Sequence, residues 1–539
     1  MKRSLVILAA IGCLFWAADD LHASEELAEH VKRMTLEEKV GQLLMLGIQG
    51  RDLSTKDIEH IRKINPGGIV FYGRNVKEAT DIAPLISKIR SISGDRELPI
   101  FFAVDQEGGL VHRIEGELYT PPSEPAIGAA NSVELSREAG LSVGSALKDL
   151  GINVNLSPVL DVPADILSSP MARRSFSNNS RTVARLGTAY IRGLREAGLL
   201  ATAKHFPGIG RANEDSHFGI PHIVWKDREE RDKDTMPFES AIRAGVDIVM
   251  VGHFIAEPGD SKNPISLSAY WMEDVLRKDM GFEGLILVDN IEMRAIKGMI
   301  PVPEAAVQSF RSGADIIMVS HEMKNQEKVF NALMDAVKKG RISHRKLHES
   351  LARIMKAKAR VMKAPVRMPG NELDHVSRSV AEASIAYLRV KDVPPLPVRK
   401  ESSALYIGYN SILLSGVKAF FRHAETLNTT LLNHRKMNPG TPIDEFLVKF
   451  DAVIMDAEYT DAAEIISACN KLNKEYIVIS GQPGRFQKII GRLHPRRIVL
   501  TFENTRVHLG VALEIISGIR QAKGRLPFPL SPLDVYVYD

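Results

Sequence analysis

The chain has 539 residues, of which 44% are hydrophobic and 25% are charged, and its formal net charge is +4 at pH 7. These proportions are typical of a globular protein, and the length exceeds that of one ordinary domain, so we expect at least two. No cluster of Lys and Arg is dense enough to predict a nucleic-acid interface, and the chain has no low-complexity segment.

The first 23 residues have the features of a secretory signal peptide. Lys2 and Arg3 precede an apolar stretch over residues 4–18, and small residues near Ala23 offer a cleavage site. The apolar stretch is shorter than the roughly 20 residues that span a bilayer. We therefore expect an exported protein, periplasmic or secreted. An uncleaved signal or a lipoprotein anchored at Cys13 is the weaker alternative, because the residues after Cys13 stay apolar.

From about residue 40, short apolar runs alternate with amphipathic segments that read as helices. Each run is nearly continuous, which is typical of strands that are buried on both faces. Eight such units predict a (β/α)8 barrel with insertions, and an open doubly wound sheet is the alternative. The runs cover residues 42–48, 67–73, 99–105, 152–159, 199–206, 246–253, 284–290 and 314–321.

A connector that contains Pro and Gly follows the last helical segment near Met362 and precedes a second alternating region. The apolar runs of that region, at 403–408, 451–456, 475–480 and 496–502, predict a smaller α/β sandwich. We expect the following division: a signal peptide over 1–23, a barrel domain over 24–363, a linker over 364–400 and the sandwich domain over 401–539.

Polar side chains follow six of the eight barrel strands at the carboxyl end, where barrel enzymes place their active sites. A single polar residue at such a place is most often a cap or a turn, but six at the same face indicate a site. They are Asp105, Asp161, the pair Lys204 and His205, His253, Asp289 and His321.

The residue types of this face favour a ligand rich in hydroxyl groups. A phosphate site would show a glycine-rich turn that enters a helix, and a metal site would show clustered ligands at suitable spacing; the chain shows neither, so we expect no metal. The groups expected to bind a sugar are Asp105, Arg113, Arg174, Lys204 and His205.

Asp289 is the candidate nucleophile, because a carboxylate held at a strand end can attack an acetal carbon. His217 is the candidate acid and base, since an imidazole has an ordinary pKa of about 6.5 and exchanges protons near neutrality. Asp215, two residues earlier in the loop 204–221, would orient that imidazole.

Six segments in this order resemble the bacterial β-N-acetylglucosaminidases of glycoside hydrolase family 3. They are DQEGG (105–109), SPVLDV (157–162), RSF (174–176), KHFPGIG (204–210), DSH (215–217) and GLILVDNIEM (284–293). The resemblance covers residues 35–360, and the second region is similar to the C-terminal sandwich of two-domain members through ASIAYLRVKDVPPLPV (383–398) and AKGRLPFPL (522–530).

This resemblance implies a retaining exo-acting hydrolase that removes terminal, non-reducing β-linked N-acetylglucosamine from peptidoglycan fragments, muropeptides or chitin oligomers. It assigns Asp289 as nucleophile and His217, assisted by Asp215, as acid and base. The five sugar-binding candidates would hold hydroxyls and the acetamido group. No metal or organic cofactor is implied.

Three positions depart from the family pattern. Ile209 stands where the KHFPGHG pattern has its second histidine, Leu110 replaces the arginine after DQEGG, and Asn290 replaces the second carboxylate beside the nucleophile. None of them removes a catalytic candidate, but they bear on substrate preference and rate.

Three other functions stay open at this point. A β-glucosidase or β-xylosidase of the same family would lack the DSH loop and carry a tryptophan at position 290. A phosphorylase would replace water with phosphate, which a histidine acid repels less than a carboxylate does. The third alternative is not an enzyme: a secreted sugar-binding protein without catalytic activity.

Overall fold

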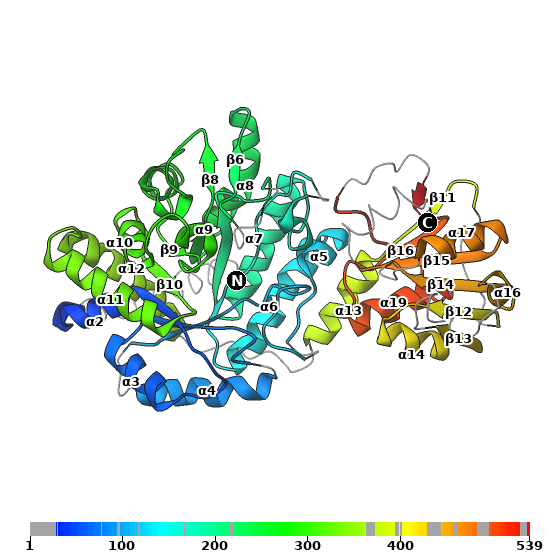
Figure 1. Cartoon of the computed structure of the whole chain (residues 1–539), viewed down its shortest axis with the longest axis horizontal. Helices are drawn as coiled ribbons and strands as arrows, with labels where there is room; N and C mark the ends of the chain where they lie inside the picture. The colour runs from blue at the N-terminus through cyan, green and yellow to red at the C-terminus, as the bar shows by residue number, and fades with distance from the viewer. Residues whose placement is uncertain are drawn as a thin grey trace, which may run out of the picture.

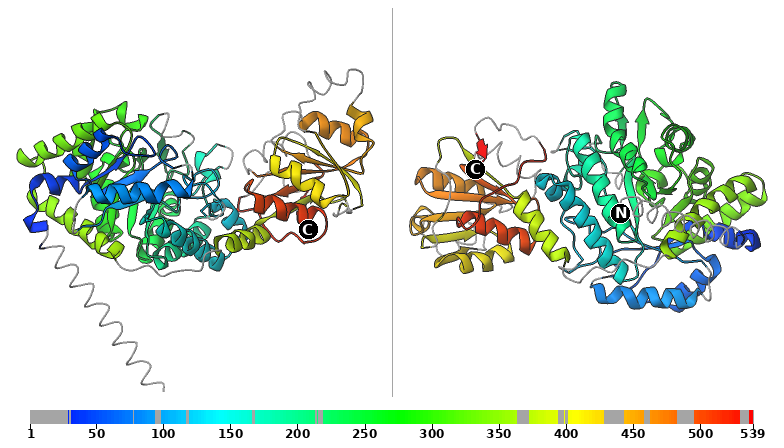
Figure 2. Two further views of the ribbon diagram at one scale, coloured as in Figure 1. Left: turned by 90° about the horizontal axis from the view of Figure 1, so that it is seen from below. Right: turned by 180° about the vertical axis from the view of Figure 1, so that it is seen from behind.

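The computed structural model describes residues 29–528, apart from residues 30, 77, 94–97, 117–118, 166–167, 213, 215–218, 363–371, 394–397, 399–400, 428–442, 458–461 and 482–494, together with residues 536–538. The predicted signal peptide lies outside these residues. Two bodies lie side by side along the long axis of the molecule, as all three views show (Figure 1, Figure 2).

The first body is a closed barrel of parallel strands, in the order β1-β10-β9-β7-β5-β4-β3-β2. Every residue of these strands is buried, which explains why each strand reads as a continuous apolar run. The eight predicted runs are the eight barrel strands. The strands are β1 (Leu44–Gly47), β2 (Gly68–Phe71), β3 (Phe101–Val104), β4 (Val154–Asn155), β5 (Leu200–Phe206), β7 (Ile248–Val251), β9 (Leu285–Val288) and β10 (Ile316–Val319).

Helices surround the barrel and bury one face against it. Capping boxes start the first two, with Thr35 and Glu38 at α2 and with Ser54 and Asp57 at α3, so the sequence marks where these helices begin. The α-helices of this body are α2 (Leu36–Gly41), α3 (Thr55–Ile64), α4 (Ala79–Ile92), α5 (Glu124–Ala130), α6 (Val133–Asp149), α7 (Ser180–Glu196), α8 (Arg228–Arg243), α9 (Arg294–Lys297), α10 (Val302–Arg311), α11 (Met323–Lys338) and α12 (His344–Met362).

Insertions extend the barrel beyond the carboxyl ends of its strands. The strands β6 (His222–Val224) and β8 (Ile255–Glu257) form a separate parallel pair, and Figure 1 shows this pair beside the start of α8. Three short helices, η1 (Pro170–Arg173), η2 (Ile265–Leu267) and η3 (Tyr270–Asp279), complete this part of the molecule.

The second body is a three-layer α/β domain around a seven-stranded sheet in the order β13-β12-β14-β15-β16-β11-β17. The four predicted runs are its strands β12 (Ser403–Ile407), β14 (Ala452–Asp456), β15 (Glu475–Ser480) and β16 (Arg497–Leu500). The other elements are β11 (Ala386–Val390), β13 (His423–Leu427), β17 (Tyr536–Tyr538), α13 (Glu372–Ser384), α14 (Ser411–Phe420), α16 (Ile443–Leu447), α17 (Ala462–Lys471) and α19 (Arg506–Ile516).

The segment expected to be a linker, 364–400, holds regular structure in its described part. It contains α13, which packs against α5 and α6 of the barrel body, and β11, which pairs antiparallel with β16 and β17. Cys469 is buried on α17. Within the described residues, none of the helices combines the length and the apolar character that a membrane span requires.

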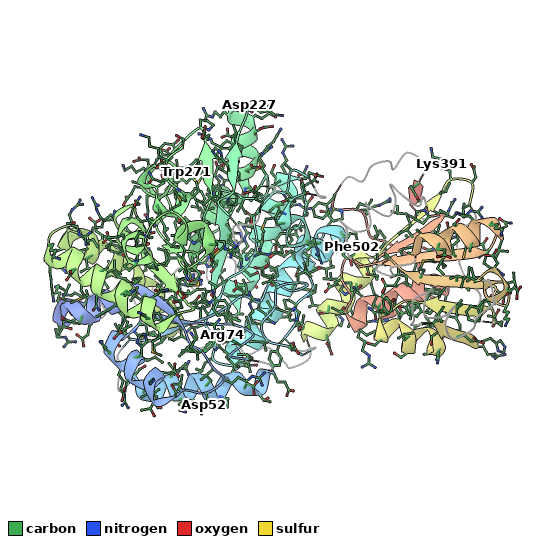
Figure 3. The ribbon with its side chains drawn as sticks, in the orientation of Figure 1. Asp52, Arg74, Asp227, Trp271, Lys391 and Phe502 are labelled. Carbon is green, nitrogen blue, oxygen red and sulfur yellow. The ribbon has the colours of Figure 1, made fainter. Side chains whose placement is uncertain are left out.

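The two bodies share one hydrophobic core and a polar contact at their junction. Phe502 and Phe528 belong to the same buried cluster as the barrel core, and Figure 3 labels Phe502 where the bodies meet. Glu503 Oε1 accepts a hydrogen bond of 3.0 Å from the backbone N–H of Ser123, the residue that caps α5. Burial raises the pKa of Glu503 to about 7.

We expect Glu503→Ala to lower the free energy of unfolding by about 1–3 kcal/mol, because the buried N–H of Ser123 then lacks an acceptor. Glu503→Gln keeps a carbonyl oxygen at the same place and should lose less. Thermal unfolding of both variants, followed by calorimetry, checks this. Equal melting temperatures for the two variants would contradict the role of the acceptor.

Candidate active site

A cavity of about 370 Å³ lies at the carboxyl ends of the barrel strands. Its walls come from most of the strands, so residues far apart in the sequence meet there, as barrel geometry dictates. The polar and aromatic lining residues are Tyr72, Asp105, Glu107, Arg113, Arg174, Lys204, His205, His253, Asp289, Asn290 and His321.

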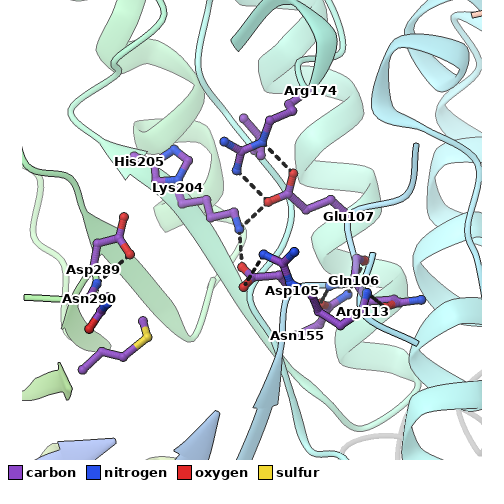
Figure 4. A network of polar contacts seen from close by, with 12 residues as sticks. Asp105, Gln106, Glu107, Arg113, Asn155, Arg174, Lys204, His205, Asp289 and Asn290 are labelled. Atoms are coloured by element: carbon purple, nitrogen blue, oxygen red, sulfur yellow. Dashed lines mark hydrogen bonds and ion pairs between the residues drawn. The ribbon is translucent and has the colours of Figure 1, made fainter. Parts of the chain in front are cut away.

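A buried lysine forms the centre of the polar network in this cavity. Lys204, only 1% exposed, places its Nζ 2.8 Å from Asp105 Oδ1 and 2.5 Å from Glu107 Oε1. Arg174 binds Glu107 with two hydrogen bonds, from Nε at 2.9 Å and from Nη2 at 2.7 Å. Arg113 Nη2 lies 3.5 Å from Asp105 Oδ2 and completes the network, which Figure 4 shows.

The charges of this largely buried network stabilise one another. Burial by itself raises the pKa of Glu107, but the adjacent Arg174 and Lys204 outweigh burial and hold that pKa far below its usual range. Burial likewise lowers the pKa of Lys204, and Asp105 and Glu107 more than compensate, so that pKa lies above its ordinary value. Glu107, Arg174 and Lys204 are therefore ionised at neutral pH.

Gln106 shapes the turn that carries these acidic residues. Its Oε1 accepts the backbone N–H groups of Arg113 (2.9 Å) and Ile114 (3.1 Å), and its backbone N–H donates to Asn155 Oδ1. Gly108 and Gly109 have φ values of 95° and 57°, which glycine adopts without strain. The sequence DQEGG thus folds so that Asp105, Glu107 and Arg113 all line the cavity.

Asp289 lies across the cavity from this network (Figure 4). Its Oδ1 accepts one hydrogen bond of 2.7 Å, from the backbone N–H of Asn290. Burial raises the pKa of Asp289, but His253, His205 and the Asn290 N–H outweigh burial, so the pKa lies below its usual value. An ionised carboxylate with few partners is suited to act as a nucleophile.

His205 is held by Asp161, which lies beneath the cavity. Asp161 Oδ2 lies 2.8 Å from His205 Nδ1, and Asp161 Oδ1 accepts the backbone N–H groups of His205 at 3.2 Å and Ile209 at 2.9 Å. Because Nδ1 faces this carboxylate, Nε2 is the ring nitrogen left for a ligand. Asp161 is fully buried, so it supports the site from behind.

His253 and Tyr72 form further walls. Burial lowers the pKa of His253, whose Nδ1 lies 2.7 Å from Ser266 Oγ and whose Nε2 lies 3.1 Å from the backbone oxygen of Asn290. The Tyr72 hydroxyl donates to Ser320 Oγ at 2.8 Å, and the Tyr72 ring lies 5.6 Å from the ring of His321. Both rings line the cavity.

The structure brings together six of the eight predicted site residues: Asp105, Arg113, Arg174, Lys204, His205 and Asp289 all line the one cavity. Asp215 and His217 lie outside the described residues. Sequence reasoning missed Glu107, although it lies in the DQEGG motif, two residues after Asp105. It also missed Tyr72. The signal that could have found this residue is its position directly after β2.

The three departures from the family pattern have visible places. Ile209 lines the cavity with an apolar side chain. Leu110 is 53% exposed and lines a second cavity, of about 240 Å³, together with Phe502. The Asn290 side chain accepts the backbone N–H of Ser320 at 3.2 Å, and so it links the ends of β9 and β10.

In the described part of the chain, no group of three or more His, Cys, Asp or Glu side chains is arranged to bind a metal ion. The cations of the site are Lys204 and the two arginines. The arrangement can bind hydroxyl groups through charged donors and acceptors and present a carboxylate to an electrophilic carbon.

The charged cavity lies at the carboxyl ends of the strands of a closed parallel barrel, where barrel enzymes place their active sites. Residues 35–357 match the model described as "Glycosyl hydrolase family 3 N terminal domain", and the chain belongs to this family. The resemblance seen in the sequence motifs is thereby confirmed, as is the fold of a barrel with a second α/β domain.

Relatives and solved structures of this family cover different shares of the chain. Beta-hexosaminidase A of Pseudoalteromonas piscicida is 28% identical over 378 residues, which are 65% of this chain and 63% of that protein. The chain therefore spans less than two thirds of that relative. Beta-hexosaminidase of Vibrio cholerae serotype O1 (strain M66-2) is 31% identical over 54% of this chain and 86% of its own length. A family 3 β-N-acetylglucosaminidase from Paenibacillus sp. str. FPU-7 has a TM-score of 0.82 and 30% identity, and the match covers 92% of this chain and 99% of that one.

Glu107→Gln should destabilise the protein by about 3–5 kcal/mol at neutral pH, because it leaves Arg174 and Lys204 buried with one negative charge fewer. The folded-state pKa of Glu107 is depressed, so its contribution is present above the ordinary pKa of 4.5 and is lost as the pH falls below it. The gap in stability between wild type and variant should narrow in acid. Denaturant unfolding from pH 7 to pH 3 measures this gap, and a gap that widens in acid would contradict the assignment.

Proposed function

We propose that the chain is a retaining exo-β-N-acetylglucosaminidase that removes terminal, non-reducing N-acetylglucosamine from peptidoglycan fragments or chitin oligomers. The observation that carries this proposal is Asp289, an ionised carboxylate at the carboxyl end of β9, opposite a network of charged groups in one cavity. The names of the relatives from Pseudoalteromonas piscicida and Vibrio cholerae and of the Paenibacillus structure support the choice of sugar.

In the first step, Asp289 attacks the anomeric carbon and the glycosidic bond breaks. His217, oriented by Asp215, donates its proton to the departing oxygen, so the leaving group departs as a neutral alcohol. The product of this step is a covalent glycosyl-enzyme. Asp289 suits the role because its pKa is depressed and it needs no separate base to remove a proton.

In the second step, water attacks the anomeric carbon and Asp289 is released. His217, now neutral, takes the proton of that water, which restores both groups to their starting states. Two displacements at one carbon return the original configuration, so the enzyme retains β stereochemistry. Neither step uses a metal or an organic cofactor.

The polar network would bind the sugar that is cleaved off. Lys204, Arg174 and Asp105 can bind hydroxyl groups through charged hydrogen bonds, and Arg113 and His205 can reach the remaining hydroxyls and the acetamido group. The cavity of about 370 Å³ lies toward the lower end of the range for small-molecule sites, about 300–1,000 Å³, which suits a single terminal sugar. This supports exo action.

The proposed glycan partner agrees with export to the periplasm or the medium, which we propose from the sequence of residues 1–23. Cell fractionation with an antibody to the protein tests this location. Substitution of Cys13 by Ala separates the alternatives, because only a lipid-anchored form would leave the membrane fraction on that change.

A panel of aryl glycosides tests the proposed activity on purified protein. We expect release from the N-acetylglucosaminide to exceed release from the glucoside and the xyloside by at least about 100-fold, because a site built to pair a polar group rejects analogues that lack it. The reaction is run with and without inorganic phosphate. A glycosyl phosphate product would indicate a phosphorylase, and turnover unchanged in Asp289→Ala would indicate a binding protein.

We expect His217→Ala to slow hydrolysis of glycosides with poor leaving groups by about 10²–10⁴-fold and to affect activated aryl glycosides much less in the bond-breaking step. The reason is that a basic leaving oxygen needs a proton more. Steady-state kinetics on a series of leaving groups gives the comparison. Equal losses across the series would remove His217 from the acid role.

A further inference from the structure

One buried carboxylate outside the cavity binds two donors from opposite ends of the segment 211–225. Asp234, on α8, is 1% exposed, and its Oδ2 accepts hydrogen bonds of 2.7 Å from Arg211 Nε and 2.7 Å from Trp225 Nε1. Arg211 Nη1 also lies 3.5 Å from Glu230 on the same helix. Burial raises the pKa of Asp234 to about 6, and the hydrogen bond from Trp225 and the charge of Arg211 oppose that rise.

The two donors flank the chain segment that contains Asp215 and His217. Arg211 precedes this segment and follows β5, whereas Trp225 follows it at the end of β6. Asp234 is thus a single acceptor for the residues at which the segment leaves the barrel and returns to it. Arg211 and Trp225 share no helix or strand, so it is the fold that brings both donors to the same oxygen.

The surroundings also hold both ends in place. Glu230 is a second, weaker link between them, because it lies 3.5 Å from Arg211 Nη1 and accepts the backbone N–H of Lys226 at 3.0 Å. On the leaving side, Asp161 accepts the N–H of Ile209, and Gly208, with a φ of 120°, brings the chain against Asp234, where a Cβ would lie 3.2 Å from the Asp234 Cβ. On the returning side, the Trp225 N–H donates to the backbone oxygen of Glu257 at 2.8 Å. The Trp225 ring packs 5.6 Å from Trp271, which Figure 3 labels near the top of the molecule.

We propose that Asp234 is a positioning residue for the proposed acid and base: by binding Arg211 and Trp225 at once, it fixes the separation of the two ends of the segment that carries Asp215 and His217. This role rests on the catalytic role proposed for His217. Asp234 is not among the described residues that line the cavity.

Hydrogen exchange on the full chain tests the structural half of this proposal without reference to catalysis. We expect Asp234→Ala to speed exchange in peptides from residues 209–226 by at least about tenfold, because local opening governs exchange, with peptides of the opposite side of the barrel unchanged. Asp234→Asn keeps an oxygen acceptor and should lie between. Asp232→Ala is the matched control, since Asp232 lies on the exposed side of the same helix and pairs with Arg228.

Trp225→Phe removes the indole donor and keeps an aromatic ring, so it tests the proposal even where Asp234→Ala does not fold. It should speed exchange in the same peptides, by less than Asp234→Ala does. Unchanged exchange in residues 209–226 for both Asp234→Asn and Trp225→Phe, or an increase spread evenly over the domain, would overturn the proposal.

Kinetics on leaving groups tests the catalytic half. Asp234→Asn and Trp225→Phe should lower kcat/KM for N-acetylglucosaminides with poor leaving groups by at least about tenfold and for activated aryl ones by less than about threefold, because a displaced acid fails mainly where protonation is needed. Faster exchange with uniform kinetic losses would overturn the positioning role. His217→Ala is measured alongside: if it shows no dependence on the leaving group, the proposed function fails, whereas the exchange data still decide whether Asp234 holds the segment.

Discussion

The site depends on the burial of one ammonium group. Lys204 is almost wholly enclosed at the end of β5, and a lone charge there would be prohibitively unstable in a medium of low polarity. The carboxylates of Asp105 and Glu107 form ion pairs with Lys204 and so stabilise its charge, and Glu107 also forms an ion pair with Arg174. These residues belong to β5, to the turn after β3 and to the end of η1, so their mutual neutralisation joins three parts of the chain at one face of the barrel. The polar network is therefore both the sugar-binding surface that we propose and a constraint on how the loops fold.

This constraint also distinguishes the carboxylates. Asp105 and Glu107 each bind a cation, and Asp161 accepts three N–H groups from the backbone and ring of His205 and from Ile209. Asp289 accepts a single short bond from its neighbour Asn290, and its pKa lies below the usual value although the described structure shows no direct ion pair to it. A carboxylate oxygen that forms no ion pair is better able to attack an electrophilic carbon. The same electrostatic field thus favours binding roles for the first group and a nucleophilic role for Asp289.

Many of the strands and site residues could be predicted from the sequence. The others could not, for physical reasons. The barrel strands were predictable because burial on both faces produces a continuous apolar run. Asp105, Lys204, His205 and Asp289 were predictable because they lie at the carboxyl ends of such runs. β11 and β17 were not, since their place at the edge of the second sheet depends on antiparallel pairing with β16 and with one another. Pairings such as Asp161 with His205, or Asp234 with Arg211 and Trp225, join residues whose spacing carries no periodic pattern. Only the folded chain determines which acceptor each donor meets.

The turn that follows β3 separates the active-site cavity from the second domain. Residues of this turn alternate between two cavities: Glu107, Val111 and Arg113 face the sugar site, whereas Gly109, Leu110 and His112 face the cavity that Phe502 and Asn504 line from the second domain. The turn is thus a thin wall between the active site and the domain junction. Glu503 binds the backbone of Ser123, which caps α5 just beyond this wall, so the junction supports the wall at its end. Glu107 and Arg113 therefore share one short segment of chain with the residues that face the second domain.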